Sequence, residues 1–422
     1  MSDRTPEPLH VAYVMTRFPQ ISETFILREM QGLVARGHQV SVIAPVLDRS
    51  PVRQPGADAF VETMIGPARA AELVGAQLHW LRHHPRRYLR LWADALWGNR
   101  ASATFLARAA LMVPFAAVAA RRLDASPVDR LHAHYATHSL LCAWAIWRLT
   151  GIPYGVTCHA HDLYVDRTML RTKLEHASVI ITISEFNRRL IAEPCGTDIA
   201  ARTRVVHCGV DTSELGPVTG DATVAAGAGA EPFRFTVIGS MQPYKGHRHA
   251  LDAFALLGDA ADQCELVLVG DGELRPSLVA HADRLGIAER TRFCGRLPSP
   301  EVFAELRAAD CVLQPSVVTE AGKMEGIPVA LMEALACERP VIASDLSGVS
   351  ELVRHGDTGV LVPAADPAAL AAAMADVIDD PEAHRLMAKR GRRFVEAEFD
   401  HERQIDQLLE LLTERPLERT TS

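Results

Sequence analysis

Apolar segments alternate along the chain with stretches of helical periodicity, and this pattern predicts the secondary structure. Short apolar runs, each followed by a polar turn, indicate buried strands. In the first half the predicted strands are residues 10–15, 39–45, 128–132, 155–158, 179–183 and 204–207. In the second half they are residues 233–238, 264–269, 291–293, 311–314, 341–343 and 359–361.

Helices are predicted between these strands. In the first half they cover 22–35, with Ser22 as the N-cap, and then 137–149, 163–175 and 185–192. In the second half they cover 248–258, 273–286, 300–309, 327–337, 366–379 and 382–398, followed by an amphipathic tail at 400–414. Residues 47–70 read as loop or short strands. A repeated strand–helix–strand order is typical of an α/β fold with parallel sheets.

A stretch rich in Gly and Ala, residues 216–230, lacks a packing pattern and reads as a linker. A length of 422 residues suits two domains. We therefore predict a first domain at 1–212, a linker at 213–231, a second domain at 232–395 and a C-terminal helix at 396–422 that packs back on the first domain. Two doubly wound domains would bind a ligand across a cleft, at the carboxyl ends of their strands.

Residues 72–123 are helical in pattern and strongly basic, with aromatic residues interleaved. One interpretation is a set of amphipathic helices over the sheet with a solvated basic face. The other is that residues 77–122 contact a polyanionic lipid carrier or the inner leaflet of a membrane.

Composition narrows the class of protein. The net charge of −8 argues against a general nucleic-acid binder, and the eight cysteines stand singly, as expected in a reduced cytosol. No apolar signal segment opens the sequence, and the apolar run 109–120, interrupted by Pro114, is shorter than the roughly 20 residues that span a bilayer. We expect a cytoplasmic protein, with peripheral contact to the inner face of the plasma membrane as the alternative raised by residues 77–122.

Two carboxylates, Glu325 and Glu333, stand with seven residues between them around a predicted helix start at Pro328. Free N–H groups at a helix start attract phosphate, and carboxylates accept hydrogen bonds from hydroxyls. Glu333 lies in an apolar stretch, where a carboxylate needs a hydrogen-bonding partner. Phosphate and hydroxyls bound together suggest a nucleotide sugar.

Glycine turns follow two strands of the second half. Residues 239–246 hold Gly239, Lys245 and Gly246, and residues 270–273 form a second turn that exposes its backbone. Each turn alone is common in proteins. Together with the carboxylate stretch, they indicate a phosphate site in which Lys245 supplies a point charge.

Paired histidines end two strands of the first half: His132 with His134, and His159 with His161, which Asp162 follows. Each could be a hydrogen-bonded structural histidine, or the pairs could bind zinc or another metal. A metal-dependent hydrolase is therefore an alternative, although the sequence offers no convincing set of further ligands.

Several stretches resemble glycosyltransferase family four, whose members are retaining enzymes with the GT-B fold. The resembling stretches are 17–26, 132–138, 159–162, 182–187, 239–246, 324–344 and 355–363. The first of them is similar to the exopolysaccharide branch that includes colanic-acid glycosyltransferases. The resemblance covers about residues 10–400 and implies two Rossmann-like domains and sugar transfer from a UDP- or GDP-linked donor to a saccharide or lipid-linked acceptor.

The resemblance also implies roles for individual residues. Catalytic roles fall to His159, Lys245 and Glu325, with His161 as an alternative to His159. Donor contacts fall to Ser22, Glu23, Thr24, Ser240, Gly272, Arg296, Gly326, Ile327, Pro328, Val329 and Glu333, with Glu333 on the ribose. Acceptor contacts fall to His134, His161 and Asp162. It implies no metal and no other cofactor, because no DxD-type motif anchors the diphosphate and Lys245 makes a metal less necessary. It also implies a front-face reaction in which the diphosphate helps to take the acceptor proton.

Two positions depart from the family pattern. Ser240 stands where the family often has an arginine five residues before the lysine, and Arg17 or Arg296 are the candidates to supply that charge. Glu338 replaces a glycine that usually precedes the strand at 341–343. A phosphorylase or epimerase of the same shape, and a non-catalytic subunit of a polysaccharide assembly, are further alternatives; intact Lys245, Glu325 and Glu333 argue against the last.

Overall fold

Residues 1–206 and 405–422 form one unit of the chain, here called unit 1, and residues 207–404 form unit 2. The computed structural model describes residues 7–20, 23–50, 54–164, 167–217 and 232–414. Residues 207–212, predicted to end the first domain, belong to unit 2. Most of the predicted linker, residues 218–231, and the predicted N-cap Ser22 lie outside the described residues.

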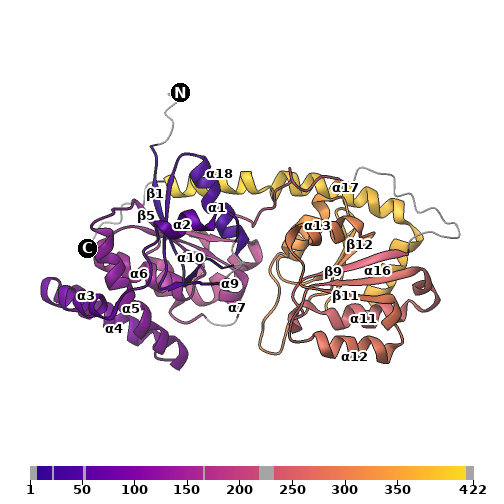
Figure 1. Ribbon diagram of the computed structural model, residues 1–422, viewed down its shortest axis with the longest axis horizontal. Coiled ribbons are helices and arrows are strands. Elements are labelled where there is room, and N and C mark those ends of the chain that lie inside the picture. Colours follow the sequence, from indigo (N-terminus) through magenta and orange to yellow (C-terminus); the bar gives the residue numbers. More distant parts are fainter. Residues whose placement is uncertain (1–6, 21–22, 51–53, 165–166, 218–231, 415–422) are drawn as a thin grey trace. The chain divides into compact units, whose positions relative to one another are not determined.

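Unit 1 is built on a parallel sheet (Figure 1). In sheet order its strands are β3 (Gln39–Ile43), β1 (His10–Val14), β5 (Arg130–His134), β6 (Tyr154–Cys158), β7 (Val179–Thr182) and β8 (Thr203–Val205). Two further short strands, β2 (Arg17–Phe18) and β4 (Val46–Leu47), follow β1 and β3 in the chain and pair with each other in a separate sheet. From β1 the chain first adds β3 on one side and then β5 and the later strands on the other side. The gap between β1 and β5 is therefore the topological switch point of this sheet.

Both faces of this sheet are covered, because alternate side chains of a strand enter two different cores. In β1, Ala12 and Val14 pack with one set of helices, whereas Val11 and Tyr13 pack with the other. The first set holds α3 (Ala70–His83), α4 (Pro85–Asn99), α5 (Ala103–Leu123), α6 (His138–Thr150), α8 (Leu170–Glu175) and α9 (Glu185–Cys195). The second holds α1 (Thr24–Ala35), α2 (Ala57–Glu62) and the C-terminal part of α18 (His401–Thr413).

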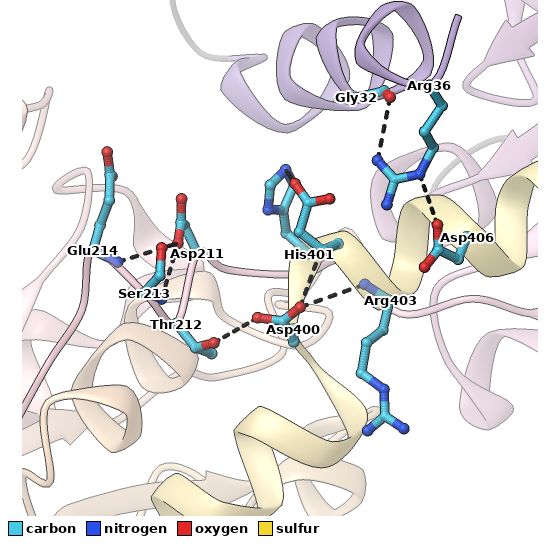
Figure 2. Close-up of polar contacts among 11 residues, drawn as sticks. Gly32, Arg36, Asp211, Thr212, Ser213, Glu214, Asp400, His401, Arg403 and Asp406 are labelled. Carbon is cyan, nitrogen blue, oxygen red and sulfur yellow. Dashed lines mark hydrogen bonds and ion pairs between the residues drawn. The ribbon is translucent and has the colours of Figure 1, made fainter. Parts of the chain in front are cut away.

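Polar contacts hold the start and the middle of helix α18 (Figure 2). Asp400 accepts hydrogen bonds from the backbone N–H of Glu402 at 3.1 Å and from the Thr212 hydroxyl at 2.5 Å, which fixes the start of the helix within unit 2. Farther along, Asp406 pairs with Arg36 of α1 at 2.7 Å, and Ile405 packs against Gly32. The sequence also predicts a C-terminal helix, and its residues 405–413 lie against α1 in unit 1.

Unit 2 has its own parallel sheet, with strands in the order β11 (Thr291–Gly295), β10 (Cys264–Val269), β9 (Phe233–Ile238), β12 (Cys311–Gln314), β13 (Val341–Asp345) and β14 (Val360–Pro363). Counted along the chain this order is 3-2-1-4-5-6, that of a doubly wound nucleotide-binding sheet. One face is covered by α11 (His247–Leu256), α12 (Arg275–Leu285) and α16 (Pro367–Asp379). The other is covered by α13 (Ser299–Ala308), α14 (Val329–Ala336) and α17 (Pro381–Glu398).

The predicted α/β class with two parallel sheets is confirmed, whereas several local predictions are wrong. The stretch 47–70 contains a helix, α2, which is too short to show a periodic pattern. The predicted helix 163–175 is instead divided into α7 (Ala160–Tyr164) and α8. Helix α1 begins at Thr24 with Glu23 as its N-cap, and Glu23 makes no side-chain capping bond.

Helix α5 is long and apolar enough to cross a membrane by length and composition. However, 56% of its most apolar window is buried inside the structure, where it packs against α3, α4 and α6. The helix is therefore explained as a core element of unit 1, because most of its large apolar side chains pack against protein, although Leu111 is exposed.

Glu338, the residue that replaces the family glycine, has a φ of 55°. This left-handed conformation favours glycine and follows the C-cap of α14, where the Glu338 N–H bonds the Leu335 carbonyl at 3.0 Å. The family glycine at this position thus has a structural explanation in the turn before β13.

Candidate active site

The sequence-predicted residues of unit 2 gather at the switch point of its sheet. Gly239 follows β9, Gly270 follows β10 and Pro315 follows β12, and β9 neighbours both of the other strands. Because all three strands are parallel, these segments leave the same edge of the sheet. Ligands of doubly wound sheets bind at this edge, outside the carboxyl ends of the strands.

The turns after β9 and β10 approach each other through their backbones. A Cβ on Gly270 would lie 2.0 Å from the Gly239 carbonyl oxygen, and one on Gly272 would lie 2.6 Å from the Met241 carbonyl oxygen. The Met241 N–H donates to the Asp271 carbonyl at 3.0 Å. Glycine is therefore required where these turns meet, and the predicted donor residue Gly272 lies in this layer.

Gly246 holds the turn after β9 against the segment after β12. Its φ is 72°, and a Cβ there would lie 1.7 Å from the Pro315 carbonyl oxygen. The backbone of residues 243–246 thus lies directly on the chain that leads to Glu325, and this contact keeps Lys245 close to that carboxylate.

We expect Gly246→Ala to destabilise unit 2 more than Gly286→Ala does. Gly286 has nearly the same φ, 70°, but open space around its missing Cβ, so its variant should cost only the left-handed strain of roughly 1 kcal/mol. Gly246→Ala adds a collision with a backbone atom, and we expect a total above about 3 kcal/mol. Chemical denaturation of both variants measures the difference; equal losses would show that Gly246 is needed for its φ alone.

Lys245 and Glu325 form an ion pair whose two side chains are each 16% exposed. The Lys245 side chain extends past Gly239, because a Cβ there would lie 3.5 Å from its Cδ and Cε. Tyr244 lies next to the pair, with the ammonium groups of Lys245 and Lys323 at 5.6 Å and 4.5 Å from its ring centre. The structure thus brings together two predicted catalytic residues that are 80 positions apart in the sequence.

Helix α14 begins beside this pair. Pro328 is its N-cap and makes no side-chain capping bond, so within the described residues the first N–H groups of the helix lack a side-chain acceptor. The predicted donor residues Gly326, Ile327 and Pro328 are buried at this start, whereas Val329 is exposed. Glu333, one turn later, is half-buried among the apolar residues of α14. An uncapped helix start with a carboxylate one turn away suits a group that carries both phosphate and hydroxyls.

His247, which the sequence reasoning did not single out, lies just after Gly246 and is 1% exposed. Burial and the Lys245 charge lower the pKa of His247 to about 4, so its imidazole is neutral near pH 7. Its place two residues after Lys245 was the available signal, because a neutral imidazole near a phosphate site can donate a hydrogen bond.

The candidates for the missing arginine differ in their surroundings. Ser240 is exposed at the turn after β9. Arg17 belongs to unit 1 and is paired with Asp48 at 3.5 Å. Arg296 follows β11 in unit 2, is exposed, and makes no ion pair within the part of the chain that the structure describes. Among the described residues, Arg296 is therefore the candidate in unit 2 whose charge is not neutralised by an ion pair, and it follows a strand of the sheet that carries Lys245 and Glu325.

A buried polar cluster in unit 1 holds two other predicted site residues, His134 and His159. His134 Nδ1 lies 3.1 Å from His159 Nε2, and His134 Nε2 lies 3.0 Å from Glu29 Oε1. The Tyr13 hydroxyl donates to the same Glu29 oxygen at 2.6 Å. His134 and His159 are 1% and 6% exposed.

Sequence reasoning missed Glu29 and Tyr13 in this cluster. The signal for Glu29 was its place on α1 between Ile26, Met30 and Leu33, a stripe that is otherwise apolar. A carboxylate on such a stripe needs a buried partner, which His134 provides.

Electrostatics separate the ionised and neutral members of this cluster. Burial would raise the pKa of Glu29, but its interaction with His134 and the hydrogen bonds from His134 and Tyr13 outweigh this effect and lower the pKa to about 2. Burial, assisted by the His134 charge, holds the pKa of His159 well below its usual value. For Glu23, burial outweighs the His134 charge and raises the pKa to about 7.

Other predicted residues of unit 1 have these surroundings. Asp162 is 3% exposed and accepts a hydrogen bond from the Ala136 N–H, and burial raises its pKa to about 7. These contacts hold the loop after β5, and acceptor binding by Asp162 stays a prediction. Thr24 is exposed at the start of α1, whereas the side chain of His161 lies outside the described residues.

Glu29, His132 and His134 are placed so that they could hold a metal ion, with ligand atoms within 4.8 Å of one another. His134 Nε2 already bonds Glu29, and His132 Nε2 bonds the Thr157 hydroxyl at 2.9 Å, whereas His132 Nδ1 has no hydrogen-bond partner within the described residues. A metal would have to replace at least the bond between His134 and Glu29, so these residues fit a hydrogen-bonded network better than a metal site.

Comparison with known proteins decides the family. The family model for glycosyltransferase family 4 matches residues 22–214, and that for glycosyl transferases group 1 matches residues 225–394. A GDP-mannose-dependent alpha-(1-6)-phosphatidylinositol monomannoside mannosyltransferase of Mycolicibacterium smegmatis is 30% identical over 61% of this chain and 69% of its own length. The chain belongs to glycosyltransferase family 4.

This glycosyltransferase also has relatives that match almost its whole length. A protein named as a colanic acid biosynthesis glycosyltransferase, WcaL of Salmonella typhimurium, is 27% identical over 96% of this chain and 99% of its own. The crystal structure of Anabaena HepE in complex with UDP superposes with a TM-score of 0.70 at 18% identity, over 96% of this chain and 100% of that one. The predicted GT-B fold is thereby confirmed, and family membership favours transfer over the hydrolase, phosphorylase and epimerase alternatives.

Proposed function

We propose that this glycosyltransferase moves a sugar from a UDP- or GDP-linked donor to a saccharide or lipid-linked acceptor, with retention of the anomeric configuration, in polysaccharide or glycoconjugate biosynthesis. One observation carries the proposal. The Lys245–Glu325 pair lies beside the uncapped start of α14, and Glu333 follows one turn later at the switch point of unit 2. This arrangement offers one cation, free N–H groups and two carboxylates, which match a diphosphate and two sets of hydroxyls.

The ion pair suggests how the donor is received. Without a donor, Lys245 and Glu325 neutralise each other. A diphosphate would take Lys245 as its partner, and Glu325 would then accept hydrogen bonds from hydroxyls of the donor sugar. The exchange gives each group a new partner, so neither of these two largely buried side chains keeps an uncompensated charge.

Transfer breaks the bond between the anomeric carbon and the diphosphate oxygen and forms a bond from that carbon to the acceptor oxygen. Negative charge grows on the diphosphate as it leaves, and Lys245 with the N–H groups of α14 would stabilise it. The proton of the acceptor hydroxyl passes to a diphosphate oxygen. This front-face route, implied by the family resemblance, assigns no nucleophilic role to a carboxylate.

The stereochemistry of the product tests retention. In the absence of acceptor, enzymes of this kind can transfer the sugar to water, and proton NMR shows which anomer forms first. From an α-linked donor we expect the α-sugar first, followed by slow mutarotation. A β-sugar as the first product would contradict the retaining route.

Metal independence follows from the same arrangement, because Lys245 and the start of α14 supply the charge that a divalent ion would otherwise supply. We expect turnover to be the same in a chelator as in buffer with added magnesium. If turnover requires a divalent ion, the leaving diphosphate is bound by a metal, and the proposal of a reaction without a cofactor is wrong.

The UDP or GDP nature of the donor rests on the relatives. Structures of Anabaena HepE hold UDP and UDP-glucose, whereas the Mycolicibacterium smegmatis relative is named for its dependence on GDP-mannose. Backbone contacts to the diphosphate serve both nucleotides, so both belong in the first donor screen.

We further propose that α3, α4 and α5 contact the inner face of a membrane, where a lipid-linked acceptor would reside. Three large apolar side chains on these helices are strongly exposed: Leu78 at 62%, Trp97 at 69% and Leu111 at 73%. Arg86 and Arg90 are exposed on α4. Exposed apolar side chains together with arginines suit the headgroup region of an anionic bilayer.

Vesicle binding tests this contact. Each arginine near an anionic surface contributes about 1 kcal/mol, so we expect Arg86→Gln combined with Arg90→Gln to weaken binding to phosphatidylglycerol vesicles about tenfold or more. The matched control is Lys389→Gln with Arg393→Gln, two exposed cations with the same spacing on α17 of unit 2. Equal effects of the two double variants would show a general charge effect and no dedicated surface.

A further inference from the structure

Helix α1 places a carboxylate behind the histidine that the family resemblance assigns to the reacting centre. Glu29 bonds His134, and His134 bonds His159, so the three side chains form one chain of hydrogen bonds from α1 to the end of β6. Glu29 is distant in sequence from both histidines, and neither the family matches nor the named relatives assign it a role.

With His134 neutral, the chemistry of the three groups gives each of these bonds one direction. An ionised carboxylate only accepts hydrogen bonds, so the nitrogen of His134 that faces Glu29, Nε2, must carry a proton. In a neutral imidazole the other nitrogen, Nδ1, then carries the lone pair and accepts from His159 Nε2. The proton of a neutral His159 is therefore on Nε2, and its Nδ1 is left as an acceptor.

Packing restricts the alternatives to this arrangement. Tyr13 stacks on His134 with ring centres 5.6 Å apart and planes at 15°, and His134 stacks on His159 at 5.3 Å and 26°. Phe25 and Tyr135 flank His159 at 5.1 Å and 4.7 Å. A ring held on several sides cannot exchange its nitrogens by turning over without displacing its neighbours.

We propose that Glu29 is a positioning residue of the transferase, which through His134 holds His159 as the Nε2–H tautomer so that its Nδ1 accepts a hydrogen bond from a hydroxyl of the reacting sugar. The role of His159 toward the sugar rests on the proposed function, whereas the tautomer does not. The arrangement follows the logic of a carboxylate–histidine pair in which the carboxylate selects the imidazole tautomer.

The charges around the relay support this state. The hydrogen bonds that Glu29 accepts from His134 and Tyr13 favour its ionised form, and burial keeps His159 neutral by lowering its pKa. His132 is also neutral, since burial lowers its pKa to about 3. Glu23 near His134 and Asp162 beside His159 both have their pKa raised to about 7, so the tautomer should be read at one fixed pH.

Nitrogen NMR of the intact protein tests the tautomer without any need for activity. With histidine labelled at both ring nitrogens, His159→Asn identifies the signals of His159. We expect a protonated Nε2 and an unprotonated Nδ1 in the unchanged protein. A protonated Nδ1 on His159, or a histidine signal shifted by a bound metal together with one equivalent of metal in the purified protein, would overturn the proposal.

Variants of Glu29 then connect the tautomer to the reaction. Glu29→Met removes the acceptor, and we expect His159 to populate both tautomers and kcat/KM to fall roughly ten- to hundred-fold. Glu29→Gln keeps an acceptor oxygen and should preserve the tautomer and most of the rate. Tyr13→Phe is the matched control, because it removes a hydrogen bond to the same Glu29 oxygen but leaves the bond to His134.

The outcomes separate the two proposals. An unchanged tautomer in Glu29→Met, or an equal loss of rate in Tyr13→Phe and Glu29→Met, overturns the positioning role. If Glu29→Met fails to fold by circular dichroism, the spectrum of the unchanged protein and of Glu29→Gln still decides the tautomer. If no nucleotide sugar is turned over by the unchanged protein, the proposed function fails, whereas the tautomer is judged on its own.

Discussion

Lys245→Ala is expected to lower kcat by about 10²–10³-fold, because it removes the side-chain cation beside the start of α14 that we propose stabilises the leaving diphosphate. Stability should change little, since a partly exposed ion pair such as Lys245–Glu325 contributes about 1 kcal/mol or less. Steady-state kinetics with the best donor, together with a melting curve, measure both effects.

Lys323→Ala is the matched control for this experiment. Lys323 is a second lysine beside Tyr244, with its ammonium 4.5 Å from the ring centre, but it lies outside the predicted donor contacts. We expect its removal to change kcat less than about threefold. A similar loss in both variants would mean that the lysines act through general charge near the site, and the specific role of Lys245 would be wrong.

Glu333→Ala is expected to weaken donor binding about 100-fold. A carboxylate that accepts hydrogen bonds from ribose hydroxyls makes charge-assisted bonds, and about 3 kcal/mol for such contacts corresponds to this factor. Calorimetric titration of the nucleoside diphosphate measures it, with Glu320→Ala, an exposed glutamate of the preceding loop, as the control.

A deoxyribose ligand sharpens the test of Glu333. The unchanged protein should lose affinity for a 2′-deoxynucleoside diphosphate, whereas Glu333→Ala should bind the ribose and deoxyribose forms almost equally, because the partner of the hydroxyl is already gone. If both proteins discriminate equally between the two ligands, Glu333 does not hold the ribose.

The strands of unit 2 could be predicted closely from the sequence. The predicted bounds of β9, β10 and β12 agree with the structure residue for residue. The physical reason is that a strand covered by helices on both faces reads as a continuous apolar run bounded by polar turns. Helix α2 was missed because six residues give too few positions for a helical pattern.

The donor side of the candidate site was predictable as a set of motifs but not as a geometry. Lys245 and Glu325 each stood in a recognisable stretch, yet nothing local shows that they pair. That contact depends on the strand order, which places β9 beside β12, and on the close backbone approach at Gly246. Strand order is a property of the whole sheet and leaves no signal in either stretch.

The histidine side was harder to predict. His134 and His159 were singled out from the sequence. Their hydrogen-bond network, however, is completed by Tyr13 of β1 and Glu29 of α1, and neither element carries a motif for this chemistry. Only the position of Glu29 on an apolar stripe could have indicated it. Burial and partner identity, which set the ionisation of this cluster, arise from packing between distant segments.

The central claim is that unit 2 binds a nucleotide sugar without a metal, and a thermal-shift titration with UDP-, GDP- and ADP-sugars in the presence of a chelator tests it most directly. A donor at 100 times its dissociation constant should stabilise the protein by about 2.7 kcal/mol. We predict this stabilisation for a UDP- or GDP-sugar, and its loss in Lys245→Ala and Glu333→Ala at the same ligand concentration. If no nucleotide sugar stabilises the protein, or if the two variants respond as the unchanged protein does, the account of this site is wrong.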